Sequence, residues 1–178
     1  MATISPDPVT QGGAYQRLLL SLLGADDPAE VQEATEGRVR SLLTEAGTNL
    51  PRRPAPAEWS VLELLGHLVD AEIVMSARFR WTISEDQPPL LGYDQDRWVT
   101  GLRHNDDRPE ELLASFSALR TANLALWRRS SAIERERVAM HAERGPESYE
   151  LMFRMIAGHD RFHLEQMRKT LEQLRAPR

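Results

Sequence analysis

Apolar positions along this 178-residue chain recur every three to four residues, which is the spacing of amphipathic helices rather than of strands. Leucine and alanine are abundant whereas valine and isoleucine are sparse, and this balance also favours helix. The chain has no alternating apolar run that would predict a strand, and no Asn-Gly or Asp-Gly turn that would predict a hairpin. The predicted helices cover residues of about 10–23, 28–47, 60–83, 109–127 and 148–174.

Two of these helices begin at clear capping signals. Asp27 can accept hydrogen bonds from the first free amides of its helix, Pro28 suits the first helical position, and Gly47 suits the end. Ser60 and Glu63 form a capping box, in which each side chain serves an amide of the other residue. The segments from about 28 to 47 and from 60 to 83 are therefore predicted to be separate helices.

The connecting segments predict how the helices are arranged. Residues 51–56 hold three prolines and form an extended connector, 84–108 form a long loop, and 131–146 form a loop or a short helical turn. Four substantial helices and a smaller one are best buried in a four-helix bundle. We therefore expect one all-α domain over residues 1–178, a four-helix bundle with long inter-helix loops.

Charge and apolar content narrow the class of protein. The chain has 22 basic and 27 acidic residues, a net charge of −5, which argues against a nonspecific nucleic-acid binder. The apolar run at 18–20 is too short to span a bilayer, and residues 1–8 lack the features of a signal peptide. We expect a cytoplasmic protein whose partners are neither nucleic acid nor membrane.

The chain contains no cysteine. It therefore has no disulfide, no thiolate metal ligand and no cysteine nucleophile. If the protein holds a transition metal, histidine and carboxylate side chains must bind it.

The last predicted helix carries two histidines, His159 and His163, four residues apart. Four residues advance about 400° around a helix, so both imidazoles leave the same face and can bind one metal ion. Asp160 stands where the zinc-metalloprotease motif needs its glutamate, which excludes that motif. The pair lies on an apolar stripe with Met152, Ile156 and Met167. The alternative is a pair of core histidines that bond to neighbouring groups.

A third histidine, His67, lies among apolar residues in the middle of the 60–83 helix. Three histidines that face one another would leave open positions on a metal, which is the pattern of catalytic rather than structural sites. Asp70 faces a similar direction and could orient a ligand imidazole, bind substrate or carry a proton, or could simply be a solvated acid. His104 has no pattern and is expected at the surface.

Two segments resemble the signature of the DinB/YfiT-like superfamily. They are EWSVLELLGHLVDAE at 58–72 and GHDRFHLEQ at 158–166. The resemblance implies a four-helix bundle in which His67, His159 and His163 bind one divalent metal, zinc or nickel in different members. It also implies that a homodimer can form.

Within the superfamily the chain resembles the YfiT-type branch most. Residues 84–88 and 93–98 are similar to that branch's long loop, and His141 stands where the branch has a histidine after its third helix. Gly66 and Phe162 replace the second histidine that often adjoins a ligand in this branch.

The resemblance implies a metal-dependent enzyme that acts on small electrophiles in detoxification or stress response. Members include hydrolases and S-transferases that use bacillithiol, and related bundles use mycothiol. A small-molecule substrate and a low-molecular-weight thiol are therefore the expected partners. The alternative is a non-catalytic metal-binding protein induced by damage or stress, as some members are known only in that way.

Candidate residues for the reaction lie near His67, in the long loop, and at the histidine that the resemblance places after the third helix. Asp70 is the candidate catalytic residue, and Tyr93, Asp94, Trp98 and His141 are candidates for substrate binding. The alternative for the loop residues is ordinary packing, with an aromatic side chain at each end.

Overall fold

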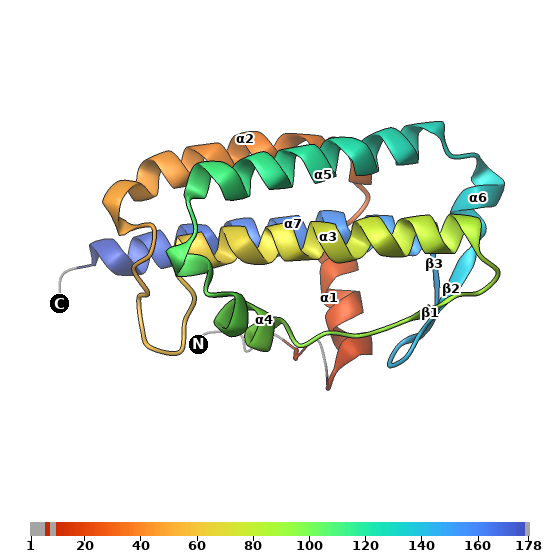
Figure 1. Cartoon of the computed structure of the whole chain (residues 1–178), viewed down its shortest axis with the longest axis horizontal. Coiled ribbons are helices and arrows are strands. Elements are labelled where there is room, and N and C mark those ends of the chain that lie inside the picture. The colour runs from red at the N-terminus through yellow and green to blue at the C-terminus, as the bar shows by residue number, and fades with distance from the viewer. Residues whose placement is uncertain (1–5, 8–9, 177–178) are drawn as a thin grey trace.

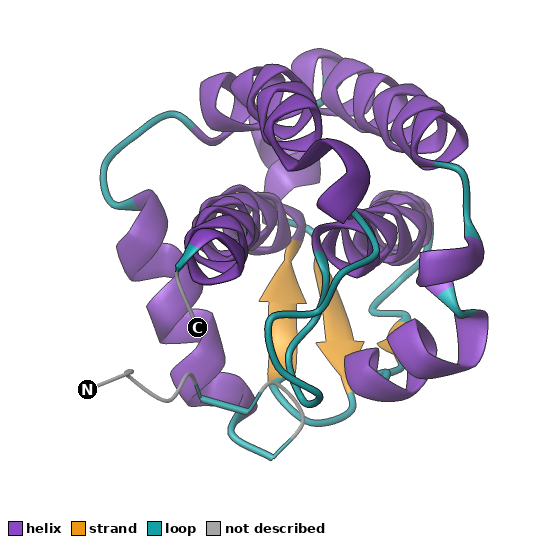
Figure 2. Cartoon of the chain, turned by 90° about the vertical axis from the view of Figure 1, so that its left-hand side faces the viewer, coloured by secondary structure: helices purple, strands orange, loops and turns teal. Residues whose placement is uncertain are grey.

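Four long helices pack side by side in the computed structural model, which describes residues 6–7 and 10–176. α2 and α5 form one layer, and α3 and α7 form the layer beneath it (Figures 1 and 2). The bounds of the four are Pro28–Ala46 for α2, Val61–Ser84 for α3, Pro109–Arg129 for α5 and Tyr149–Arg175 for α7. The predicted all-α four-helix bundle is confirmed.

Shorter elements surround this bundle. α1 packs across α7 on the outside, and α4 lies below the bundle in the long connection between α3 and α5 (Figure 1). Their bounds are Gly12–Leu23 for α1, Gln95–Leu102 for α4 and Ala132–Glu136 for α6, with 3-10 turns η1 at Gly47–Asn49 and η2 at His104–Asp106.

The helix ends follow the capping residues of the sequence. The Asp27 side chain accepts hydrogen bonds from the amides of Ala29 and Glu30 at the start of α2. Both halves of the capping box between Ser60 and Glu63 are formed at the start of α3. These local hydrogen bonds depend on residues three or fewer positions apart, which is why the sequence predicts them well.

Three short strands depart from the expectation that the chain contains none. β1 (Pro89–Leu90) pairs in parallel with β2 (Val138–His141), and β2 pairs in antiparallel with β3 (Gly145–Ser148). They join the two segments that the sequence predicts to be loops, because backbone amides and carbonyls of one segment form hydrogen bonds with those of the other. The apolar pattern could not reveal this pairing, since β1 and β2 lie about fifty residues apart in the chain.

A buried ionic cluster crosses the core between the helices. Arg120 of α5 donates two hydrogen bonds to Asp160 of α7, at 2.5 and 3.0 Å, and one to Glu72 of α3 at 2.9 Å. Thr35 of α2 donates to Asp160 at 2.8 Å, and Asn123 donates to Glu72 at 2.9 Å. The cluster therefore connects all four long helices and fixes α7 at the residue next to His159.

α1 lies unusually close to α7 at Gly158. A Cβ atom at this position would lie 2.0 Å from the backbone oxygen of Leu19. Only glycine allows this approach, because any side chain would overlap the α1 backbone.

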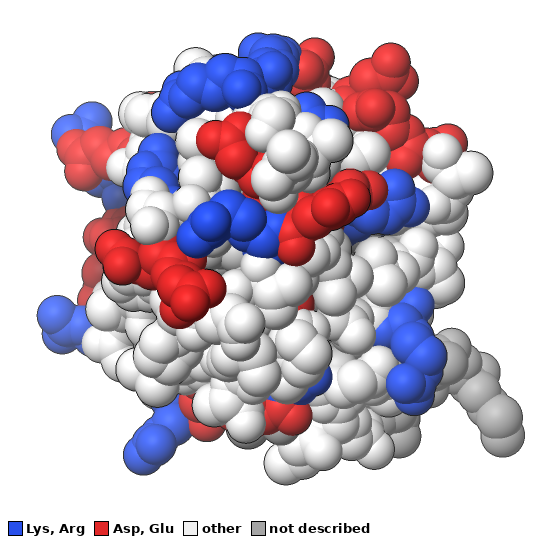
Figure 3. Space-filling view, turned by 90° about the vertical axis from the view of Figure 1, so that its right-hand side faces the viewer, with Lys and Arg blue, Asp and Glu red and all other residues white. Residues whose placement is uncertain are grey.

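The surface at the α6 end of the bundle mixes charges of both signs. Basic and acidic side chains lie next to one another on this face rather than in separate fields (Figure 3). No helix in the described part of the chain is long and apolar enough to cross a membrane.

Candidate metal centre

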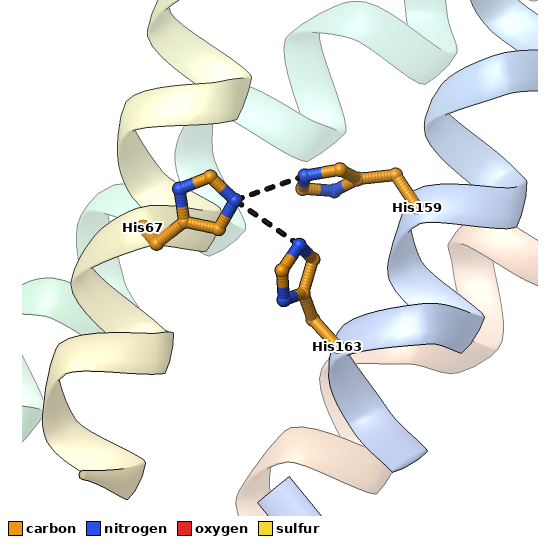
Figure 4. A group of neighbouring side chains, drawn as sticks. All are labelled: His67, His159 and His163. Carbon is orange, nitrogen blue, oxygen red and sulfur yellow. Dashed lines mark hydrogen bonds between the residues drawn. The ribbon is translucent and has the colours of Figure 1, made fainter. Parts of the chain in front are cut away.

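Three buried histidines meet between α3 and α7. His67 projects from α3, and His159 and His163 project from successive turns of α7 toward it (Figure 4). Their residues are 1%, 7% and 1% exposed. The Nε2 atom of His67 lies 3.0 Å from that of His159 and 3.1 Å from that of His163.

This geometry fits a shared metal ion. Two nitrogen ligands about 2.0–2.1 Å from one ion, at angles of about 90–110°, lie about 2.9–3.4 Å from each other. The measured distances from His67 fall in this range, and the three ligand atoms lie within 4.8 Å of one another. No fourth histidine, aspartate or glutamate joins this group within the described residues. The set therefore matches a three-nitrogen site with open positions.

Neighbouring groups orient one of the three imidazoles. His163 Nδ1 lies 2.9 Å from the Oε1 atom of Gln166, one turn further along α7. An amide oxygen can only accept, so Nδ1 carries the proton and Nε2 presents its lone pair to the centre. The Trp59 ring stacks on His163 with 6.3 Å between ring centroids and an angle of 15°.

The electrostatic environment keeps all three imidazoles neutral. Burial, followed by the neighbouring imidazoles, holds the pKa of His67 and of His159 well below the ordinary value. Burial lowers the pKa of His163 to about 4, against a smaller opposing effect of Gln166. Neutral imidazole is the form that binds metal, so the site is ready for an ion near neutral pH.

Asp70 contacts His104 rather than a ligand imidazole. The Asp70 carboxylate lies 2.9 Å from His104 Nε2, and Asp107 lies 2.9 Å from His104 Nδ1. A carboxylate at each nitrogen favours the protonated imidazole, and the bond to Asp70 is the largest cause of the raised pKa of His104. His104 is 5% exposed, so its predicted surface position is wrong.

Gly66 makes room for this buried histidine. A Cβ atom at Gly66 would lie 2.2 Å from the ring of His104. The sequence could not place His104 here, because a long connection brings η2 back against α3. The same contact explains why the residue before His67 is glycine.

A pocket opens beside the metal centre, and His159 lies in its wall. It encloses about 690 Å³, its open mouth included. Of the predicted substrate-binding residues, Tyr93 and His141 lie in its wall. Asp94 instead caps α4 by accepting from the Arg97 amide at 3.0 Å, and Trp98 packs on Tyr93 with 4.6 Å between ring centroids.

Three residues near the site are not predicted from the sequence. Gln166 lies three positions after His163. A search for residues that can bond the other ring nitrogen of a metal ligand would find this spacing. Tyr15 and Arg78 also lie in the pocket wall, but neither stands near a metal ligand in the sequence. Only the packing of α1 and the strands around α3 reveals them.

The fold and the three histidines define a class of helical-bundle proteins. The family model described as the DinB superfamily matches residues 29–167, and the chain belongs to this superfamily. The structure is similar to that of YfiT from Bacillus subtilis, described as "a probable metal-dependent hydrolase with an unusual four-helix bundle topology". The TM-score is 0.76 at 18% identity, over 83% of this chain and 85% of that one, so this similarity shows the fold.

A relative in sequence comes from Oceanobacillus iheyensis and is named "Putative metal-dependent hydrolase". It is 29% identical over 107 residues, which are 60% of this chain. The match spans 61% of that relative's own length.

Proposed function

We propose that the protein is a metal-dependent enzyme in which His67, His159 and His163 hold one divalent transition metal, zinc or nickel. The observation that carries the proposal is the convergence of three buried Nε2 atoms beside a pocket that His159 lines. Three protein ligands leave open positions, as catalytic sites require. Membership of the DinB superfamily and the names of its two relatives support the same class.

The reaction we propose is attack on a small electrophile, either hydrolysis by water or transfer to a thiol. A bound divalent metal would lower the pKa of water or of a thiol, which makes the nucleophile available near neutral pH. The chain has no cysteine, so the thiol of an S-transfer must be a low-molecular-weight cosubstrate. In the transfer the thiol gives its proton to water, a carbon–sulfur bond forms, and the bond from that carbon to the leaving group breaks, so that the leaving group departs with the electron pair.

The chain's own residues orient the site and exclude water from it. Gln166 holds the Nδ1 proton of His163, so that the Nε2 lone pair faces the centre. The flat face of Trp59 covers the same imidazole. Asp70 is the proposed catalytic acid–base residue, and the imidazolium of His104 fixes its carboxylate. Tyr93 and His141 contact the substrate in the pocket wall.

The alternative function is a non-catalytic metal-binding protein of the stress response. A structural metal site is normally closed by a fourth protein ligand. Within the described residues only three candidate ligands converge, which favours a catalytic over a structural metal site.

Metal content and turnover test the proposal. Elemental analysis of the purified protein should find about one zinc or nickel ion per chain, and His163→Ala should lose most of it. His141→Gln is the matched control and should keep its metal, because His141 lies outside the triad. A fully loaded His163→Ala variant would refute the ligand assignment.

Turnover distinguishes the two reactions. Chlorobimane would be supplied with bacillithiol, mycothiol or glutathione, and p-nitrophenyl esters would be supplied without a thiol. Metal-dependent turnover that His163→Ala abolishes supports the enzyme. A loaded protein that turns over neither kind of substrate would favour the non-catalytic alternative.

A further inference from the structure

A buried arginine without an acidic partner lies in the pocket wall. Arg78 of α3 is 6% exposed, and no carboxylate of the described residues lies within 4.0 Å of its guanidinium. Its Nη2 atom donates to the backbone oxygen of Leu91 at 2.5 Å. Of the two acids in its surroundings, Glu147 is buried and bonded to Arg144 at 2.5 and 3.0 Å, and Glu143 is exposed. Burying an arginine without a counter-ion is costly, so its retention in the pocket wall calls for an explanation.

His141 adds a second donor beside Arg78. The amide of Glu143 donates to His141 Nδ1 at 3.2 Å, so this nitrogen has no proton. Burial, and then the charge of Arg144, lowers the pKa of His141 to about 4, so the ring is neutral and its proton lies on Nε2. This Nε2–H group lies 3.4 Å from Arg78 Nη2. In this tautomer both groups present a proton, so an acceptor placed between them could bond to both.

A hydroxyl without a partner lies in the same pocket. Tyr15 of α1 is 7% exposed, and its hydroxyl has no hydrogen-bond partner in the described part of the chain. A buried hydroxyl without a partner is unfavourable unless a ligand supplies one. Glu143 and Arg144 contribute one charge of each sign to the wall, and its apolar part is formed by Leu19, Ala71, Met75, Met152, Met155 and Ile156.

We propose that this end of the pocket binds a carboxylate of the substrate, with Arg78, His141 and Tyr15 as its donors. The inference rests on the proposed function, because it places the other end of the substrate at the metal centre. A planar guanidinium suits the two oxygens of a carboxylate, and the neutral imidazole and the hydroxyl add directional bonds. The substrate is thus a carboxylic acid with an apolar body.

The pocket also sets the length of that body. Along α3 the wall runs from Ala71, one turn after His67, to Arg78. Seven residues rise about 10 Å in a helix. An acid with an extended apolar body suits a wall of this length better than the smallest acids do.

Binding of octanoate and of its amide tests the proposal without any turnover. Titration calorimetry on the metal-loaded 178-residue chain should show octanoate binding at least tenfold more tightly than octanamide. Charge-assisted hydrogen bonds are worth about tenfold to a hundredfold in affinity, so Arg78→Gln should weaken octanoate by that factor and leave octanamide unchanged. Arg80→Gln, on the exposed face of the same helix, is the matched control and should bind like the unchanged protein.

Two results would overturn the proposal. One is equal affinity of the unchanged protein for octanoate and octanamide, a comparison that needs no variant to fold. The other is unchanged octanoate binding in a folded Arg78→Gln variant, which would place the carboxylate on the metal instead. Failure of the proposed function would show separately, as missing metal or missing turnover, while the octanoate preference would remain.

Discussion

Replacing Arg120, the buried arginine of the core, tests how the helices are held together. Arg120→Met replaces a guanidinium that bonds Asp160 and Glu72 with an apolar side chain of similar length. Both carboxylates are fully or almost fully buried. The variant therefore leaves two buried acids that keep only the Thr35 and Asn123 donors.

The expected loss of stability is large. Removing one partner of a buried ion pair costs about 3–5 kcal/mol, because the remaining charge is uncompensated. Domains of this kind are stable by about 5–15 kcal/mol, so Arg120→Met should lose a substantial share. Glu72→Gln and Asp160→Asn added to Arg120→Met remove the stranded charges, and the triple variant should recover most of the loss.

The loss of stability in Arg120→Met should also depend on pH. Burial raises the pKa of Glu72, and without Arg120 this pKa should rise further. A carboxyl whose folded pKa is raised above its unfolded value favours the folded state at low pH and loses that contribution as pH rises. The deficit of Arg120→Met should therefore be largest at pH 7–8 and smaller near pH 5.

Urea denaturation followed by circular dichroism measures both effects in one metal-saturated buffer. With an m-value of about 2 kcal/mol/M, a loss of about 4 kcal/mol lowers the midpoint by about 2 M. Arg128→Met is the control on the same helix, since its ion pair with Glu33 is exposed and worth about 0–1 kcal/mol. A loss below about 1 kcal/mol in Arg120→Met, or one that stays constant from pH 8 to pH 5, would refute the reasoning.

Three further predictions concern the surroundings of the metal centre. Gly66→Ala should displace the ring of His104 and destabilise the fold by about 1–3 kcal/mol, measured by the same urea titration. Asp70→Asn should lower the pKa of His104, observed by NMR. Because the pKa of His104 is raised, its protonation stabilises the fold at pH values below the ordinary histidine pKa. This contribution is lost as the pH rises through the raised pKa, so the stability of the variant should lose that pH dependence. Gly158→Ala should separate α1 from α7 at Leu19, seen as faster amide exchange in α1, and unchanged exchange would contradict it.

The histidine pair on the last helix illustrates what sequence can predict. His159 and His163 share a face because any helix turns about 400° over four residues, whatever surrounds it. The caps at Asp27 and Ser60 are local in the same sense, since donor and acceptor lie within three residues. Periodicity and capping therefore determined the long helices, their ends and two of the three candidate ligands.

The tertiary structure decided which distant groups meet. His67 faces the α7 pair because α3 packs against α7, and His104 is buried because η2 returns to the space that Gly66 leaves. The pairing of β1 with β2 and the pocket wall formed by Tyr15, Arg78 and His141 likewise join segments far apart in the chain. Such contacts depend on the packing of whole elements, and no local pattern of residues encodes them.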